Sequence, residues 1–231
     1  MSTTDDAAAA APAQAAFEPQ AGIGVPIGVF GFGFAVLVLG FADARIFTPN
    51  AIGFFAPVAF SFGAIMLLLG GIYELRANNI FGGTFCLAYA GFLFSTGLIL
   101  RFYAPAIIGV AGASGFGDAF GTWLLMWCVF TFMLSLGAYR VNMPAFLAFI
   151  LLALAYLLLG IASTMAAGDT TTFLTKAGGW VLIIDGITAW YLAWALTVNG
   201  LIGDKLPLWP YPYTWVEKRE TPAGIAPTPA G

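Results

Sequence analysis

Long apolar runs separated by short polar segments occupy most of the sequence between residues 24 and 199. Each run is about 20 residues long, the length at which an α-helix crosses a hydrocarbon core roughly 30 Å thick. The pattern predicts an all-α, polytopic membrane protein with six transmembrane helices, at 24–42, 51–73, 80–100, 118–139, 144–166 and 177–199.

Polar residues, prolines and glycines between the runs mark the predicted connections. The second and fourth connections, 74–79 and 140–143, are short turns. The third contains Pro105 and a stretch of Gly, Ala and Ser residues, and the fifth contains Asp169, a threonine run and Lys176. Such clusters are typical of loops, so we expect irregular structure at both places.

The two ends of the chain differ from this central part. Residues 1–22 are rich in Ala, Pro and acidic residues and contain no Lys or Arg. A secretory signal begins with a positively charged region, so we interpret 1–22 as a disordered tail. Residues 23–208 form the predicted transmembrane domain, and 209–231 combine an aromatic anchor at the membrane interface with a disordered C-terminal tail.

The composition indicates a membrane location and an orientation. Charged residues make up 8% of the chain, against about 25% in a soluble domain. Lys and Arg are more frequent in cytoplasmic loops, so we expect a multi-pass protein of the plasma (inner) membrane with both termini in the cytoplasm. The side shared by the termini carries Arg76, Arg140, Lys205, Lys218 and Arg219, and the other side carries Arg45, Arg101 and Lys176.

The same composition excludes several function classes. The chain has no histidine, the usual haem ligand, and no Lys inside a predicted span that would form a retinal Schiff base. Cys86 and Cys128 lack the spacing of a metal site, and no basic cluster indicates nucleic acid. We therefore expect no metal, no cofactor, no nucleic-acid partner and no enzymatic activity.

One stretch resembles a known family. It reads Gly71-Ile-Tyr-Glu-Leu-Arg-Ala-Asn-Asn-Ile-Phe-Gly82, followed by Tyr89-Ala-Gly-Phe92. It is similar to the acetate uptake transporter family, the bacterial acetate–succinate permeases and their fungal relatives. The resemblance continues to Leu206-Pro-Leu208. The family's opening Asn-Pro-x-Pro-x-Gly motif is incomplete, because Ile23 and Gly24 precede the matching Pro26 and Gly28.

The resemblance implies a function and an assembly. It implies a transporter or channel for acetate and similar short monocarboxylates, with succinate as a further substrate, that is linked to protons. It also implies a homohexamer in the lipid bilayer with one pore per protomer. A passive channel for small neutral solutes such as ammonia is the alternative interpretation.

The resemblance also assigns roles to individual residues. Phe32, Tyr89 and Leu152 match a narrow apolar constriction, and Phe32 lies on the opposite helix face from Phe30 and Phe34. Further matches are the substrate-selectivity positions Ala189 and Thr188, the entrance motif Pro26 and Gly28, and the structural motif Glu74, Asn79, Phe81 and Gly82. Within this motif, Asn79 is placed to cap the third helix.

Asp185 lies deep inside a predicted span. Placing an acidic side chain in the membrane costs free energy, so Asp185 is a candidate functional residue. It lies one helical turn from Ala189. Two interpretations remain open. Either Asp185 faces the pore as a proton relay, or it has a structural role, protonated or hydrogen-bonded to a neighbouring helix.

An anion would meet no fixed positive charge inside these predicted spans. Dehydrating a carboxylate in so apolar a path is costly. Two routes remain open: the solute crosses as its neutral acid, or helix-end N–H groups near Pro26 and Gly28 hold it transiently. The pairs Gly24/Gly28 and Gly179/Gly186 are available either for oligomer contacts or for packing within one protomer.

Overall fold

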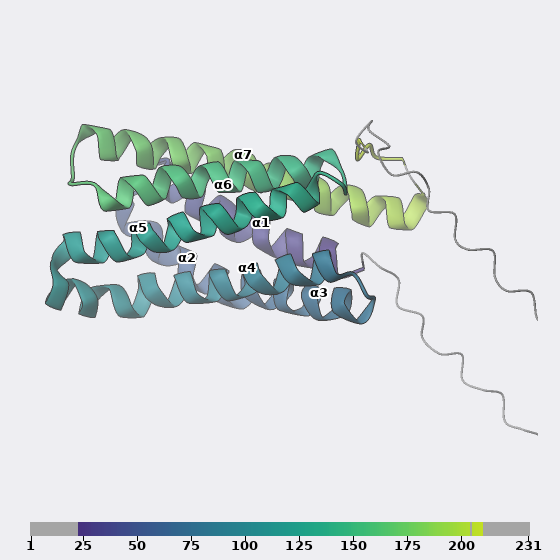
Figure 1. The fold of residues 1–231 in the computed structure, drawn as a ribbon, viewed down its shortest axis with the longest axis horizontal. Coiled ribbons are helices and arrows are strands. Elements are labelled where there is room, and N and C mark those ends of the chain that lie inside the picture. Colours follow the sequence, from purple (N-terminus) through teal and green to yellow (C-terminus); the bar gives the residue numbers. More distant parts are fainter. Residues whose placement is uncertain (1–22, 204, 210–231) are drawn as a thin grey trace, which may run out of the picture.

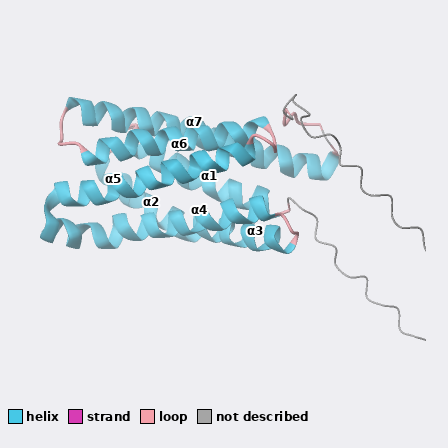
Figure 2. Cartoon of the chain, viewed as in Figure 1, coloured by secondary structure: helices cyan, strands magenta, loops and turns pink. Residues whose placement is uncertain are grey.

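The structure, a computed structural model, describes residues 23–203 and 205–209 (Figure 1). Within these ranges the regular elements are all helices, as Figure 2 shows. The predicted N-terminal tail and most of the C-terminal segment lie outside them. The elements are α1 (Gly24–Asp43), η1 (Pro49–Phe54), α2 (Phe55–Val58), η2 (Ala59–Ala64), α3 (Ile65–Arg76), α4 (Ile80–Leu98), η3 (Ile99–Tyr103), α5 (Ala104–Ala138), α6 (Met143–Thr164) and α7 (Asp169–Ile202).

Five continuous helical segments of the described chain are long and apolar enough to cross a membrane. The third, Ile80–Ala138, has 59 residues and reverses direction at Gly112, whose φ of 74° breaks the helix. Three contacts bring its two halves together as antiparallel neighbours: Phe81 with Gly137, Tyr89 with Thr131, and Thr96 with Trp123. This segment therefore holds two crossings, which confirms the predicted all-α membrane fold with six passes.

Two predicted loops are wrong. The connection before residue 118 is helical apart from the reversal at Gly112, and Pro105 occupies the first turn of α5, where proline is tolerated. The threonine run belongs to α7, which begins at Asp169. The physical reason is that polar residues mark where a helix leaves the membrane, and a helix continues beyond that boundary.

The helices form a bundle in which α1 packs between α3 and α7. α3 also contacts α4, α5 contacts α6, and α6 contacts α7. Side-chain hydrogen bonds join α4 to α5, so each helix of the bundle contacts the next and the helices form a closed ring. The start of α1 and the end of α7 lie at the same end of the bundle (Figure 1).

Close packing in the bundle depends on glycine. A Cβ atom on Gly24 would overlap the carbonyl oxygen of Gly70, and one on Gly179 would overlap the backbone of Ala44. In a bilayer, helix association depends on such close approach because lipid supplies no hydrophobic drive between helices. Gly24 and Gly179 therefore serve packing within one protomer.

The first residues after α7 fold back on the bundle. The Tyr191 hydroxyl donates to the carbonyl oxygen of Pro207 at 2.6 Å, and the Tyr191 ring stacks on Trp209. The Met143 N–H bonds to the carbonyl of Leu208 at 3.3 Å. These contacts place the start of the predicted aromatic anchor beside α6 and α7, and the remainder lies outside the described residues.

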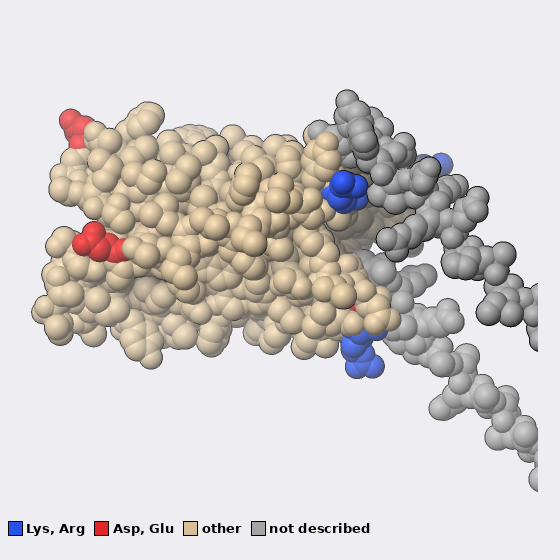
Figure 3. Space-filling view, in the orientation of Figure 1, with Lys and Arg blue, Asp and Glu red and all other residues tan. Residues whose placement is uncertain are grey.

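The exterior of the bundle matches a bilayer. Large apolar side chains on the flanks are exposed, including Leu68, Met133 and Ile187. Figure 3 shows the visible acidic and basic side chains at the two ends, with an uncharged flank between them. The mean hydropathy is +0.93, so the chain is a multi-pass membrane protein.

Gly24→Ala tests the glycine contact between α1 and α3. We expect it to lower the free energy of unfolding by about 1–3 kcal/mol, because the methyl group meets backbone that cannot move aside. The control is Gly91→Ala, since nothing lies within 4 Å of a Cβ on Gly91; this helical substitution is expected to stabilise by up to about 1 kcal/mol. Thermal unfolding in detergent measures the stability of both variants. Equal midpoints for Gly24→Ala and Gly91→Ala would contradict the close packing of α1 against α3 at Gly24.

Candidate functional site

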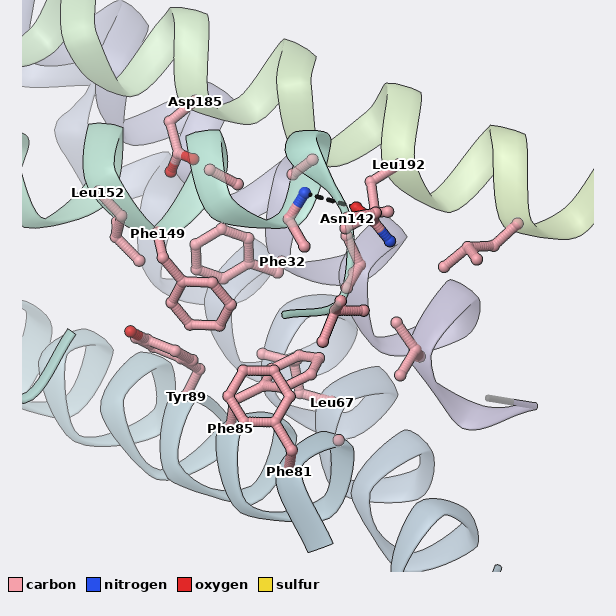
Figure 4. A pocket seen from close by; sticks show the side chains of 18 of the residues that line it. Phe32, Leu67, Phe81, Phe85, Tyr89, Asn142, Phe149, Leu152, Asp185 and Leu192 are labelled. Atoms are coloured by element: carbon pink, nitrogen blue, oxygen red, sulfur yellow. Dashed lines mark hydrogen bonds between the residues drawn. The ribbon is translucent and has the colours of Figure 1, made fainter. Parts of the chain in front are cut away.

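A cavity of about 250 Å³ lies inside the bundle. Side chains from α1, α3, α4, α6 and α7 line it, and most of them are apolar. At one end the lining includes Asn79, Val141 and Asn142, in the turns at the end of the bundle where α1 begins. Val141 is 52% exposed, so the mouth of the cavity is at this end. Figure 4 shows Asn142 and Leu192 at one end, and Asp185, Leu152 and Tyr89 at the other.

The three predicted constriction residues meet at this inner end. Phe32 from α1, Tyr89 from α4 and Leu152 from α6 all line the cavity, and they are 7%, 2% and 3% exposed. The ring centroids of Phe32 and Tyr89 are 5.6 Å apart. Phe34, on the other face of α1, is 42% exposed. The opposition of Phe32 and Phe34 derived from helical periodicity, and the inward position that the resemblance gave to Phe32, therefore agree with the structure.

The remaining predicted pathway residues divide into two groups. Ala189 lines the cavity one turn from Asp185, and Phe81 and Gly82 line its mouth. Thr188 does not line the cavity, and its hydroxyl donates to the carbonyl of Ile184 at 2.8 Å. Pro26 and Gly28 do not line the cavity either; the start of α1 contributes Val25 and Val29 instead.

Glu74 ties the mouth of the cavity together. This fully buried side chain accepts hydrogen bonds from the backbone N–H groups of Gly24 at 2.6 Å and Val25 at 3.0 Å. The Asn79 amide also donates to Glu74, while the Asn79 oxygen caps α4 by accepting from the Gly82 N–H. One carboxylate thus joins the start of α1 to the α3–α4 turn, and a negative charge at a helix N-terminus is favourable.

This arrangement weakens one of the two predicted routes for an anion. Of the first N–H groups of α1, those of Gly24 and Val25 already bond to Glu74, and Pro26 has none. A substrate carboxylate at this helix start would also face the Glu74 carboxylate. The start of α1 is therefore occupied by the protein's own acid, a contact for which the sequence gives no local signal.

Two buried polar groups lack a described partner: Asp185, which lines the inner end of the cavity, and Tyr156, which lies one turn after Leu152 on α6 and is not part of the lining. Neither carboxyl oxygen of Asp185 has a hydrogen bond among the described residues, and the same holds for the Tyr156 hydroxyl. The Tyr89 hydroxyl, in contrast, bonds to the Thr131 hydroxyl at 2.7 Å. Buried polar groups almost always have a partner, so Asp185 and Tyr156 are exceptions among the described residues.

Comparison with known proteins assigns the family. A family profile described as the GPR1/FUN34/yaaH family matches residues 7–202. The chain belongs to the GPR1/FUN34/yaaH family. This membership confirms the resemblance found in the sequence.

Relatives in this family carry transport names. The chain is 36% identical to ammonia transport outward protein 2 of Saccharomyces cerevisiae and 31% identical to acetate permease A of Emericella nidulans, over 74% of this chain and 59% of each relative. It therefore spans about three fifths of these fungal relatives. It is 25% identical to the succinate-acetate/proton symporter SatP of Escherichia coli K12, over 77% of this chain and 89% of SatP.

A solved structure shares the fold. The structure of the bacterial acetate channel SatP aligns with a TM-score of 0.69 at 24% sequence identity. The alignment covers 80% of this chain and 97% of that chain. This GPR1/FUN34/yaaH protein and SatP therefore share a fold.

Glu74→Ala tests the tie at the cavity mouth. It leaves the N–H groups of Gly24 and Val25 without their acceptor, at a cost of about 1–3 kcal/mol for each buried group. We expect a clearly lower thermal midpoint in detergent. Glu74→Gln retains one oxygen and should lose less, while the exposed control Asp118→Ala should change stability by less than about 0.5 kcal/mol. If Glu74→Ala had the same thermal midpoint as the wild type, the result would contradict a role for Glu74 in holding α1 to the α3–α4 turn.

Proposed function

We propose that this chain forms a pathway across the membrane for acetate and similar short monocarboxylates, with one proton accompanying each carboxylate. Succinate is a further candidate substrate. The observation that carries the proposal is the meeting of Phe32, Tyr89 and Leu152 at the inner end of a cavity that opens at one end of the bundle. The names of the relatives support the class of solute.

The lining determines the form in which the solute crosses. The cavity has no Lys or Arg in its wall, and an isolated carboxylate in such surroundings is strongly disfavoured. A protonated acid avoids this cost. The apolar constriction would exclude bulky solutes and bulk water, while Tyr89 offers a hydroxyl near the carboxyl group. Asp185 is the candidate proton relay, and Ala189 is the candidate selectivity residue.

A passive channel for small neutral solutes such as ammonia is the second candidate. The name of the yeast relative favours it, and the apolar constriction also suits a small neutral molecule. Transport of ammonia without any acetate uptake would favour this alternative over the first.

Assembly and placement complete the proposal. We propose a homohexamer in the plasma (inner) membrane, with the bilayer as its partner and both termini in the cytoplasm. The described cations do not decide the orientation, since Arg76, Arg140 and Lys205 lie at one end of the bundle and Arg45, Arg101 and Lys176 at the other. The preference depends on Lys218 and Arg219, which lie outside the described residues.

Uptake of labelled acetate into proteoliposomes tests the proposal directly. We expect uptake above that of protein-free liposomes, and faster initial uptake at the lower of two external pH values, because the carboxylate enters together with a proton. Protein-free liposomes measured at each pH correct for diffusion of acetic acid through the lipid. Uptake no greater than this background at either pH would overturn the acetate assignment.

Leu152→Ala tests the constriction. Removing three carbon atoms from the narrowest region should raise the ratio of butyrate to acetate uptake roughly tenfold, the scale of one or two methylene groups in an apolar site. Leu154→Ala is the matched control, because Leu154 lies on the same helix and is 41% exposed on the outside. An equal change in the ratio for both variants would place Leu152 outside the pathway.

A further inference from the structure

Asp185 differs from the other polar side chains in the wall of the cavity. Among the described residues, the polar side chains that line it are Asn79, Tyr89, Asn142 and Asp185. The Asn79 and Asn142 side chains cap α4 and α6, and the Tyr89 hydroxyl bonds to the Thr131 hydroxyl. Neither carboxyl oxygen of Asp185 has a hydrogen bond within the described part of the chain. Asp185 therefore holds the unused hydrogen-bonding groups of the lining.

The surroundings keep Asp185 neutral. An ionised carboxylate that is buried without a cation or a hydrogen-bond donor is strongly disfavoured, and no Lys or Arg is among the described residues that line the cavity. The ionisable neighbours are Tyr89 from α4 and Tyr156 from α6. α1, which packs on α7, carries no ionisable side chain before Asp43, and Glu74 on α3 is engaged at the mouth.

We propose that Asp185 recognises solutes that carry a hydrogen-bond donor and an acceptor on the same edge, so that the pathway admits short primary amides such as acetamide as well as short carboxylic acids. The proposal rests on the proposed function, because it takes the pathway from it. A neutral carboxyl group offers an O–H donor beside a carbonyl acceptor. The Asp185 O–H donates to the amide oxygen, and the amide N–H donates to the other Asp185 oxygen.

The wall around Asp185 suits the apolar part of such a solute. Leu152 lies at the same inner end of the cavity (Figure 4), and Ala189 lines the cavity one turn from Asp185. A methyl group would contact these two side chains while the polar edge of the solute faces Asp185. The Asp185 side chain is 0% exposed, so a solute reaches it only when neighbouring side chains move aside, which favours small, flat molecules.

Neither kind of solute carries a charge through the constriction. The acid crosses in its neutral form, as in the proposed function, and the amide is neutral throughout, so the constriction stays closed to bare carboxylates and to bulk water. The two differ in one respect. The supply of neutral acid depends on pH, whereas a primary amide has no group that titrates near neutral pH. Amide uptake therefore reports on the protein without the titration of the solute.

The test measures labelled acetamide in proteoliposomes and, separately, the inhibition of labelled acetate uptake by unlabelled acetamide. Acetone is the matched probe, because it has nearly the same size and shape but offers an acceptor and no donor. We expect acetamide uptake above that of protein-free liposomes, at the same rate at two external pH values. Acetamide should inhibit acetate uptake roughly tenfold more strongly than acetone, the scale of the hydrogen bonds that acetone cannot form.

Substitutions locate this recognition at Asp185. Asp185→Val removes the donor and the acceptor, so it should lower acetamide uptake roughly tenfold. Asp185→Asn retains a carbonyl acceptor and N–H donors, so its acetamide uptake should stay close to that of the wild type. The control Asp169→Val changes an exposed acid at the start of the same helix and should leave uptake unchanged. A merely structural role for Asp185 would not separate acetamide from acetone.

The outcomes distinguish this site from the pathway itself. Equal inhibition by acetone and acetamide, or equal acetamide uptake by the wild type and Asp185→Val, would overturn the recognition by Asp185 while leaving the proposed function intact. If Asp185→Val does not fold, the comparison of acetamide with acetone in the wild type still carries the test. Absence of acetate uptake in the wild type would overturn the proposed function, and acetamide uptake that persisted there would still support the site.

Discussion

The free-energy cost of placing a charged group in an apolar medium is the constraint on which the rest of this structure depends. A helix in lipid satisfies its own backbone, but a buried acid or hydroxyl needs a partner from elsewhere. Two acids nevertheless lie fully buried in the bundle, Glu74 and Asp185. Their surroundings differ, because Glu74 has several hydrogen-bond donors and Asp185 has none among the described residues.

At the mouth, Glu74 receives backbone N–H groups from α1 and the amide of Asn79. Its negative charge meets the positive end of a helix, so it holds the wall of the cavity in place. At the inner end, Asp185 has no such donors among the described residues. An acid without protein partners beside a cavity is suited to exchange a proton with a solute, whereas an acid with several donors is suited to hold a structure together.

Periodicity and length identified much of this from the sequence. The spans, the opposite faces of Phe32 and Phe34 and the capping position of Asn79 follow from local rules, whereas the family resemblance selected Phe32 as the inward residue. The bond from Glu74 to the start of α1 joins residues 50 positions apart, and no local pattern signals it. The sequence also did not separate Ala189 from Thr188, because adjacent helical residues differ by about 100° in direction and small shifts decide which one reaches the cavity. The segments before residue 118 and after Asp169 were predicted to be loops but are helical, because polar residues mark the membrane boundary and not the end of a helix.

The dependence of acetate uptake on membrane potential tests the central claim most directly. Proteoliposomes with a potassium gradient and valinomycin hold the potential at chosen values while pH is equal on both sides. If each carboxylate crosses with one proton, no net charge moves, and the initial rate should be the same at every potential. A rate that rises as the interior becomes more positive would mean that the bare anion crosses, and would contradict a path that admits the solute only when its charge is neutralised.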